Sequence, residues 1–264
     1  MGGHPRREEG RGGRERLREE GAVAHFGSRA ALLAAALSFA GCASAGGGGV
    51  PPAPTDPAAL EAETREGFPL PARLAEGDRW FVTVRPGEGP DPIAVRRRRR
   101  RAGDFVREEV AWGRSFAEVA AAKHGVIQVF GVHLGPRGLG VAPLDADDRP
   151  LAEPALEVPA PPKPGTAWEV PATPRSRAIA GLVERVEEVD TPAGKQRALR
   201  VSHRATDGEV FVATSWYDRG LRPIRLEIRV SGALVEAHAA LGSAEPSADE
   251  CRAAIEWAKK HFAK

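Results

Sequence analysis

Alternation of apolar and charged residues near the C-terminal end is the feature that most constrains this fold. Between residues 224 and 230 the sequence Ile-Arg-Leu-Glu-Ile-Arg-Val has a period of two. This period is typical of a strand with one face against a core and the other in water. Turn-forming residues such as Asp207-Gly208 separate apolar runs at 199–203 and 210–217. The pattern predicts an antiparallel meander in the second half of the chain.

The first half carries weaker signals of the same kind. Residues 80–84, 106–112 and 126–134 are rich in strand-forming residues, and we expect three strands there. The Ala-rich run 116–122 fits either a strand or a helix. His124-Gly125 is a candidate turn before the third strand.

A short motif occurs twice and divides the body of the chain. Pro-Ala, four residues, then Gly-x-x-Trp ends once at Trp80 and again at Trp168. The repeat favours two related halves, about 68–145 and 158–242, joined by the Pro-rich stretch 150–164. A motif this loose also recurs by chance, so both explanations stay open.

Residues 248–262 form the clearest helical segment. Ser247 followed by Glu250 is typical of a capping box. Apolar residues then recur at helical spacing, at Cys251, Ile255, Ala258 and Phe262. We therefore predict an amphipathic helix packed on the sheet, with Cys251 either a small buried apolar side chain or a reactive thiol.

The N-terminal region has the features of an export signal. Eleven uncharged residues, 30–40, follow Arg29 and end at Gly41-Cys42. As a helix they span about 16 Å, too short for the roughly 30 Å hydrocarbon layer. Leu-Ser-Phe-Ala-Gly-Cys at 37–42 resembles the lipobox of bacterial lipoproteins, although Phe39 departs from the usual aliphatic residue. The resemblance implies that residues 1–41 are a signal peptide and that Cys42 carries the lipid, with no second cysteine then left to pair with Cys251.

Two alternatives remain for this region. A general secretory signal cut near Ala43 or Ala45 would leave a protein without a lipid. Residues 1–22 are long and charged for a signal, and Val23 is an alternative start. Residues 42–66 are rich in Gly and Pro and predict a flexible stalk before the body at 67–264.

The charge of the chain does not favour nucleic acid as a partner. Seven of the 38 Lys and Arg and five of the 36 Asp and Glu lie in residues 1–41, so the remainder carries 31 of each and is neutral. We expect no nucleic-acid partner.

The second half resembles a group of secreted or lipid-anchored bacterial proteins. The shared residues are Gly165-Thr-Ala-Trp168, Glu187-Glu-Val189, Pro192-Ala-Gly194, Trp216-Tyr217 and Gly220. Arg222-Pro223 and the closing helix depart from the pattern of the group. The resemblance, loosely shared with half-barrel carriers of the lipoprotein-localisation system, implies a mainly β (α+β) fold. Together with the repeated motif and the closing helix, it predicts a curved antiparallel sheet or half-barrel built from two related halves, with a C-terminal amphipathic helix.

The residues of catalysis and metal binding do not form a recognisable pattern. Ser202, His203 and Ser215 lie near one another in sequence, with Asp207 and Asp218 available, but adjacent strand residues point to opposite faces. The Asp-rich run 145–148 lacks the glycine and final Glu of a calcium loop and fits an ordinary turn. We therefore expect no catalytic residue, no metal, no cofactor and no enzymatic activity.

Six consecutive arginines are the most conspicuous local feature of the body. They are Arg96, Arg97, Arg98, Arg99, Arg100 and Arg101. Such a run could contact anionic lipid or other anionic envelope material. It also fits a solvated strand or loop at a sheet edge, followed by a turn at 102–104 toward the acidic residues Glu108 and Glu109.

The function expected from these patterns is that of a membrane-anchored envelope lipoprotein without enzymatic activity. Its partners would be the membrane, through lipid on Cys42, and an apolar or amphiphilic ligand or an envelope protein on the curved sheet. The alternative is a structural or assembly adaptor that contacts anionic material through Arg96–Arg101. The periplasmic side of the outer membrane is the expected location, ahead of the inner membrane.

Overall fold

The computed structural model describes residues 58, 62, 65–74, 79–84, 93–102, 105–113, 126–145, 147–172, 178–206, 210–242 and 246–262. Within them the chain forms twelve strands and a C-terminal helix. The elements are β1 (Arg79–Val84), β2 (Ile93–Ala102), β3 (Phe105–Gly113), β4 (Val126–Gly135), β5 (Gly138–Pro143), β6 (Ala155–Pro159), β7 (Ala167–Val170), β8 (Ile179–Thr191), β9 (Gly194–Ala205), β10 (Phe211–Tyr217), β11 (Pro223–Val230), β12 (Ala233–Ala240) and α4 (Ala248–Phe262).

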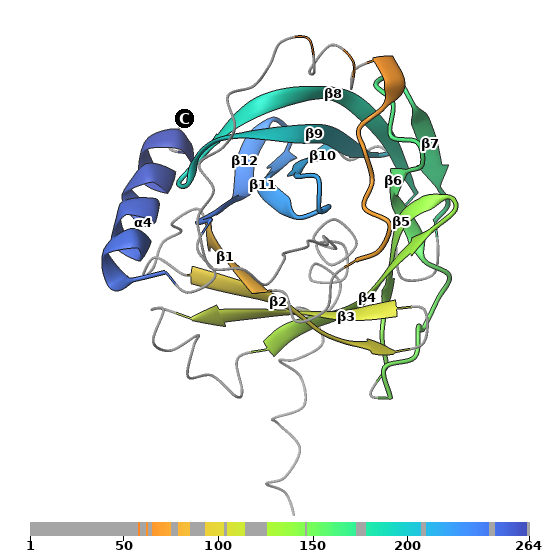
Figure 1. Cartoon of the computed structure of the whole chain (residues 1–264), viewed down its shortest axis with the longest axis horizontal. Helices are drawn as coiled ribbons and strands as arrows, with labels where there is room; N and C mark the ends of the chain where they lie inside the picture. The colour runs from red at the N-terminus through yellow and green to blue at the C-terminus, as the bar shows by residue number, and fades with distance from the viewer. Residues whose placement is uncertain are drawn as a thin grey trace, which may run out of the picture.

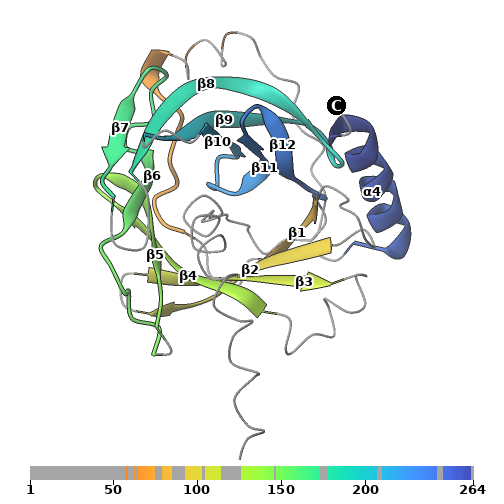
Figure 2. The ribbon, with the colours of Figure 1, turned by 180° about the vertical axis from the view of Figure 1, so that it is seen from behind.

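All twelve strands belong to one antiparallel sheet. Its order is β6-β5-β4-β3-β2-β1-β12-β11-β10-β9-β8-β7, so β1–β6 and β7–β12 are two six-stranded meanders joined through the pairing of β1 with β12. Figures 1 and 2 show the strands arranged as a ring in both views, with α4 outside it. The predicted mainly β body, with its curved antiparallel sheet and C-terminal helix, is confirmed.

Local sequence explains the hairpins of the second meander. The turn between β8 and β9 needs a left-handed residue, and Gly194 supplies it with a φ of 100°. Between β10 and β11, the Asp218 carboxylate accepts hydrogen bonds from the backbone N–H groups of Gly220 and Arg222, at 2.9 and 2.8 Å. Short turns of this kind favour antiparallel neighbours over crossovers.

The sheet curls until its two outermost strands, β6 and β7, approach each other. The indole Nε1 of Trp168 in β7 donates a hydrogen bond to the Leu156 carbonyl oxygen of β6, at 2.8 Å. On the other side of β7, Trp168 lies over Gly181 of β8, where a Cβ would come within 2.2 Å of the indole ring. Gly181 therefore makes room for the tryptophan that joins the two edges.

The inner face of the curled sheet is apolar. Buried residues from both meanders form one core cluster that includes Val82, Val110, Phe130, Val141, Val201 and Leu226. Phe68 and Leu74, which precede β1, belong to the same cluster and are 2% and 3% exposed. The segment that carries them lies inside the ring of strands in both views (Figures 1 and 2).

Helix α4 packs on the outer face, on β12 and near β1. Its residues Ala258 and Phe262 form a small second cluster with Leu234, Ala237 and Ala239. The capping box is present: the Ser247 backbone N–H donates to the Glu250 carboxylate, 2.6 Å, and the Glu250 backbone N–H donates to Ser247 Oγ, 3.2 Å.

The buried stripe of α4 differs at one residue from the predicted one. It consists of Cys251, Ala254, Ala258 and Phe262, and Ile255 is only partly buried. Cys251 is 5% exposed, and burial, with the Glu250 charge, raises the pKa of its thiol. This agrees with an apolar role for Cys251.

The structure differs from the sequence expectation in the Pro-rich linker, and it describes the expected stalk only in part. β6 lies within the Pro-rich stretch 150–164 that was expected to join two halves. Of residues 42–66, those at 58, 62, 65 and 66 have helical backbone, and the others lie outside the described residues. The run 116–122 and the turn at 124–125 also lie outside them. The relation between two halves by duplication, and the finer description as a half-barrel, stay predictions.

Candidate functional site

Three side chains from distant strands meet where β6 approaches β7. His203 of β9 lies 3.6 Å from Glu157 of β6, measured from Nε2 to Oε2, and each residue is 4% exposed. The ring of Trp168 stands edge-on to the imidazole with 5.5 Å between centroids. Burial lowers the pKa of His203 to about 4, partly opposed by a contact with the Glu157 backbone, so the ring is neutral at neutral pH.

Ser215 of β10 lies on the same inner face as His203. The register pairs Ala213 with His203 and Ser215 with Val201, so Ser215 is the diagonal neighbour of His203, with about 7–8 Å between them. Ser215 is fully buried. Among the residues that the structure describes, no hydrogen-bond partner reaches its Oγ. A buried polar group left without a partner costs about 1–3 kcal/mol.

Of the serine and aspartate residues considered for a catalytic triad, Ser215 is the one that the described structure places on the face of His203. Ser202 pairs with Thr214 and lies on the outer face, opposite to His203, as strand alternation predicts. Asp218 is used by the turn before β11, and Asp207 lies outside the described residues. The carboxyl group that does meet His203 is Glu157, which belongs to the other meander.

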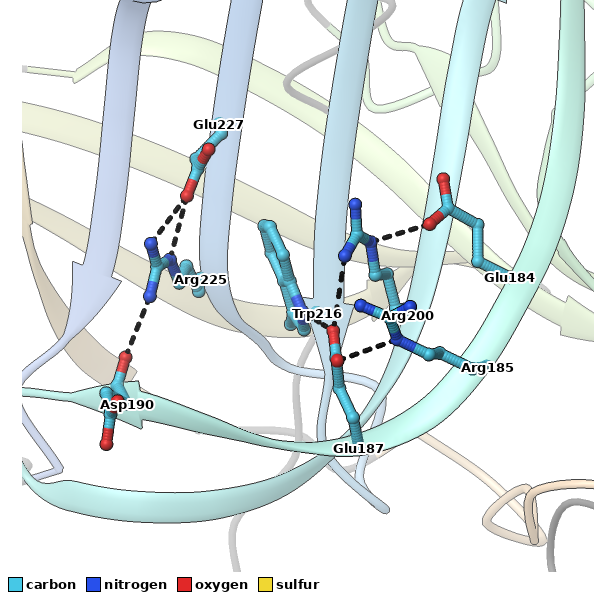
Figure 3. A network of polar contacts seen from close by, with 8 residues as sticks. All are labelled: Glu184, Arg185, Glu187, Asp190, Arg200, Trp216, Arg225 and Glu227. Atoms are coloured by element: carbon cyan, nitrogen blue, oxygen red, sulfur yellow. Dashed lines mark hydrogen bonds and ion pairs between the residues drawn. The ribbon is translucent and has the colours of Figure 1, made fainter. Parts of the chain in front are cut away.

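The outer face of the same strands carries a connected set of polar contacts, which we call the outer network (Figure 3). Its members are Glu184, Arg185, Glu187, Asp190, Arg200, Trp216, Arg225 and Glu227. At its centre, Trp216 donates from Nε1 to the Glu187 carboxylate, 2.8 Å, and lies between two guanidinium groups. Those of Arg200 and Arg225 are 5.2 and 5.3 Å from its ring centroid.

Ion pairs connect the rest of the outer network. Arg200 pairs with Glu184 at 2.7 Å, and Arg185 pairs with Glu187 at the same distance. Burial alone would raise the pKa of Glu187, but hydrogen bonds from Trp216 and Arg185 and the charges of Arg185 and Arg200 lower it overall. The carboxylate is therefore ionised and satisfied by its neighbours.

Arg225 connects the outer network to the helix. Its guanidinium lies 5.2 Å from the ring centroid of Phe262 and 6.0 Å from that of Trp257, both in α4. It also pairs with Glu227 at 2.6 Å. The network therefore stabilises the outer face and the docking of α4.

The Asp-rich turn has a structural use. The Asp145 carboxylate accepts hydrogen bonds from the backbone N–H groups of Asp147 and Arg149, each at 2.8 Å. Asp148 forms an ion pair with Arg107 of β3. Within the described ranges, no group of three or more His, Cys, Asp and Glu residues could hold a metal ion.

The structure places the backbone of the arginine run but says nothing of its side chains. Arg96–Arg101 lie in β2, which pairs with β1 on one side and β3 on the other. The expectation of a sheet edge is therefore wrong, because β2 has a paired strand on each side. The register sets Arg97 opposite Glu109 and Arg98 opposite Glu108, as the predicted turn at 102–104 implies.

Cys42 and the signal region lie outside the described residues. In the part of the chain that the structure does describe, no helix has the length and apolar character needed to cross a bilayer.

Sequence reasoning missed Glu157, Phe68 and Leu74. Glu157 left one signal, a single charge in the apolar run Leu-Glu-Val, but its partner lies 46 residues away in another strand. Phe68 and Leu74 stand among prolines next to the expected stalk, so their burial depends on contacts with distant strands.

No protein-family model and no curated protein matches the chain. One similar solved structure, from Bacteroides fragilis NCTC 9343, is described as an exported protein with a YmcC-like fold; it is 14% identical, with 66% of this chain and 97% of that chain covered and a TM-score of 0.41. Another, from Parabacteroides distasonis ATCC 8503, is described as a lipoprotein. It is 10% identical, with 66% of this chain and 96% of that chain covered and a TM-score of 0.32. Likeness at this level carries no conclusion about this chain.

Proposed function

We propose that this chain is an exported, lipid-anchored protein of the bacterial envelope that binds an apolar or amphiphilic ligand against the inner face of its curved sheet, without catalysing a reaction. The outer membrane, on its periplasmic side, is the proposed location. The membrane is the proposed partner, through acyl chains on Cys42.

The proposed location on the membrane rests on the sequence. The uncharged run 30–40 ends at Cys42 in a lipobox-like context, and two or three acyl chains hold a protein on a membrane far more firmly than one. The Gly- and Pro-rich residues that follow separate the anchor from the folded body.

The ligand-binding role rests on one observation: the inner face of the sheet is lined by apolar side chains, and the chain's own residues Phe68 and Leu74 are buried in the cluster that they form. These two residues belong to a segment without strand or helix. An inner face that buries apolar groups from such a segment has the chemistry to bury those of a ligand.

Radiolabelled palmitate tests the anchor. Wild-type protein made in a bacterial host should incorporate label and fractionate with membranes, and Cys42→Ala should do neither. An unlabelled wild type, or equal label in both proteins, contradicts the proposal.

Uptake of a fluorescent apolar probe, N-phenyl-1-naphthylamine, tests the ligand role. Full-length protein freed of non-covalent lipid should bind the probe saturably. Val201→Thr, which adds a hydroxyl to the inner lining, should weaken binding, whereas Arg200→Gln, one residue away on the outer face, should not. Equal effects of the two changes, or no saturable uptake, contradict binding at the inner face.

A further inference from the structure

The segment before β1 occupies the inside of the sheet without belonging to it. We call residues 67–74 the strap. They form neither strand nor helix, yet Phe68 and Leu74 are buried in the main core and the partly buried Leu70 packs against it. Figures 1 and 2 both show the strap inside the ring of strands.

The strap enters beside the place where β6 approaches β7. The Phe68 backbone N–H donates to the Pro162 carbonyl oxygen, 3.2 Å, in the connection between these two strands. Gly67, with a φ of 102°, sits so close to the same connection that a Cβ would lie 3.1 Å from Lys163 Cγ. The strap is therefore fixed at its beginning by a backbone hydrogen bond, and its apolar side chains pack in the core.

The inner face also contains polar groups that the strap does not satisfy. Ser215 Oγ has no hydrogen-bond partner among the described residues, and the polar contact of His203 there is with Glu157; both residues are more than nine-tenths buried. They share one face, about 7–8 Å apart. An apolar interior does not retain such groups at a gain in stability, so they indicate a polar part of a ligand.

We infer that the strap is a displaceable occupant of the inner face, and that the ligand that replaces it is an amphiphile with an uncharged, hydrogen-bonding head. The apolar tail takes the place of Phe68 and Leu74. The head pairs with Ser215 and His203. This inference rests on the proposed ligand-binding role. It adds the class of ligand, and it identifies the strap as the segment that fills the site when no ligand is bound.

The charges of the site favour an uncharged head. Glu157 places a carboxyl group 3.6 Å from His203, and the buried imidazole is neutral and offers no charge to an anion. A second carboxylate there would be repelled and poorly solvated. A glycerol-sized head supplies several hydroxyl groups and spans the distance between Ser215 and His203.

Limited trypsin digestion tests the displacement of the strap in the full chain carrying Cys42→Ser, which keeps acyl chains on that cysteine out of the assay. Cleavage after Arg73 requires that the buried Leu74 leave the core. Saturating 1-monooleoylglycerol should speed this cleavage at least about threefold, with cleavage after the exposed Arg137 of the β4–β5 turn as the reference. An unchanged ratio of the two cuts contradicts a displaceable strap.

Binding of 1-monooleoylglycerol to variants tests both parts of the inference. Phe68→Ser with Leu74→Ser should raise the affinity at least about fivefold, because the tail no longer competes with the strap. Leu226→Ala, equally buried in the same core, is the control for general destabilisation. Ser215→Ala should lower the affinity about threefold to tenfold, the worth of one hydrogen bond, and Thr214→Val on the outer face should not.

Oleate at alkaline pH, with the same tail and an anionic head, should bind at least about fivefold more weakly than 1-monooleoylglycerol. Equal affinities, or an unaffected Ser215→Ala, contradict the uncharged head. If the wild type binds 1-monooleoylglycerol while the strap variant has the affinity of the wild type, the strap inference fails and the proposed function stands. If neither the wild type nor the folded strap variant binds any of these probes, the proposed function fails with it.

Discussion

The two faces of strands β9 to β11 use polar residues in opposite ways. On the outer face, Arg200, Trp216 and Arg225 form a network in which each group contacts an oppositely charged or aromatic neighbour. On the inner face of the same strands, Ser215, next to Trp216 in β10, is buried without a hydrogen-bond partner in the part of the chain that the structure describes, and the buried His203 of β9 has Glu157 as its polar contact.

The difference indicates different roles for the two faces. Satisfied, partly solvated contacts stabilise the fold by small amounts each, and they hold the outer face and α4 together. Unsatisfied buried groups lower stability, so their presence is better explained by something that the inner face binds. The comparison can be tested by changing neighbouring residues that point to opposite faces.

The largest contrast is expected between Leu226 and Glu227, neighbours in β11. Leu226 is 1% exposed in the main core, so Leu226→Ala should lower the free energy of unfolding by about 2–5 kcal/mol. Glu227→Ala removes outer ion pairs with Arg225 and Arg229 and should cost about 1 kcal/mol or less. Urea unfolding of both variants measures the two losses; similar losses would remove the contrast between the faces.

Acidification should affect the inner face first. His203 has a pKa of about 4 when folded and an ordinary value of 6.5, so the unfolded state takes up its proton first as the pH falls. The stability is complete above pH 6.5 and should decrease by about 3 kcal/mol between pH 6.5 and 4.

Urea unfolding across this pH range, compared with His203→Gln, isolates the effect of His203. The variant should show a flatter profile, and an identical slope would assign the effect to other groups. The lowered pKa of Glu187 on the outer face affects stability at lower pH. Its contribution to stability is lost only as the pH falls through and below the ordinary carboxyl value of 4.5.

A smaller effect is expected from the centre of the outer network. Glu187→Gln removes ion pairs with Arg185 and Arg200 and weakens the hydrogen bond from Trp216, with an expected cost of about 1 kcal/mol or less. The cost should shrink at high salt, because these groups are partly solvated. Glu256→Gln, in an exposed pair with Lys259 on α4, is the control and should have almost no effect.

Ser215→Ala should cause the smallest loss: the free energy of unfolding should not fall and should rise by up to about 1–3 kcal/mol, because the change removes a buried hydroxyl that has no partner and leaves none unsatisfied. Ser247→Ala, which removes a paired cap hydroxyl, should cost about 1 kcal/mol. Thermal unfolding of the two variants gives the comparison. A loss above 1 kcal/mol at Ser215 would mean that the hydroxyl is satisfied in the folded protein, and the argument from an unpartnered group would fail.

Much of the second meander could be predicted from residues close together in the sequence. Alternation predicted β11, the apolar runs 199–203 and 210–217 predicted β9 and β10, and Ser247 with Glu250 predicted the start of α4. These signals are local because a hairpin turn or a helix cap joins residues only a few positions apart.

The candidate site could be predicted only in part. Strand alternation separated Ser202 from His203, but nothing local indicated that Glu157 would meet His203, or that Arg96–Arg101 would lie inside the sheet. Both outcomes depend on pairing between strands that are far apart in sequence.

By itself, therefore, the sequence determined the strand period, the turns and the closing helix, and it predicts an export signal that ends at Cys42. The tertiary structure decided which face became the interior, what filled it and which polar groups it enclosed. The physical reason is the curl of the sheet: it brings β6 toward β7 and encloses Phe68, Leu74 and His203, and no short window of sequence contains the contacts that produce it.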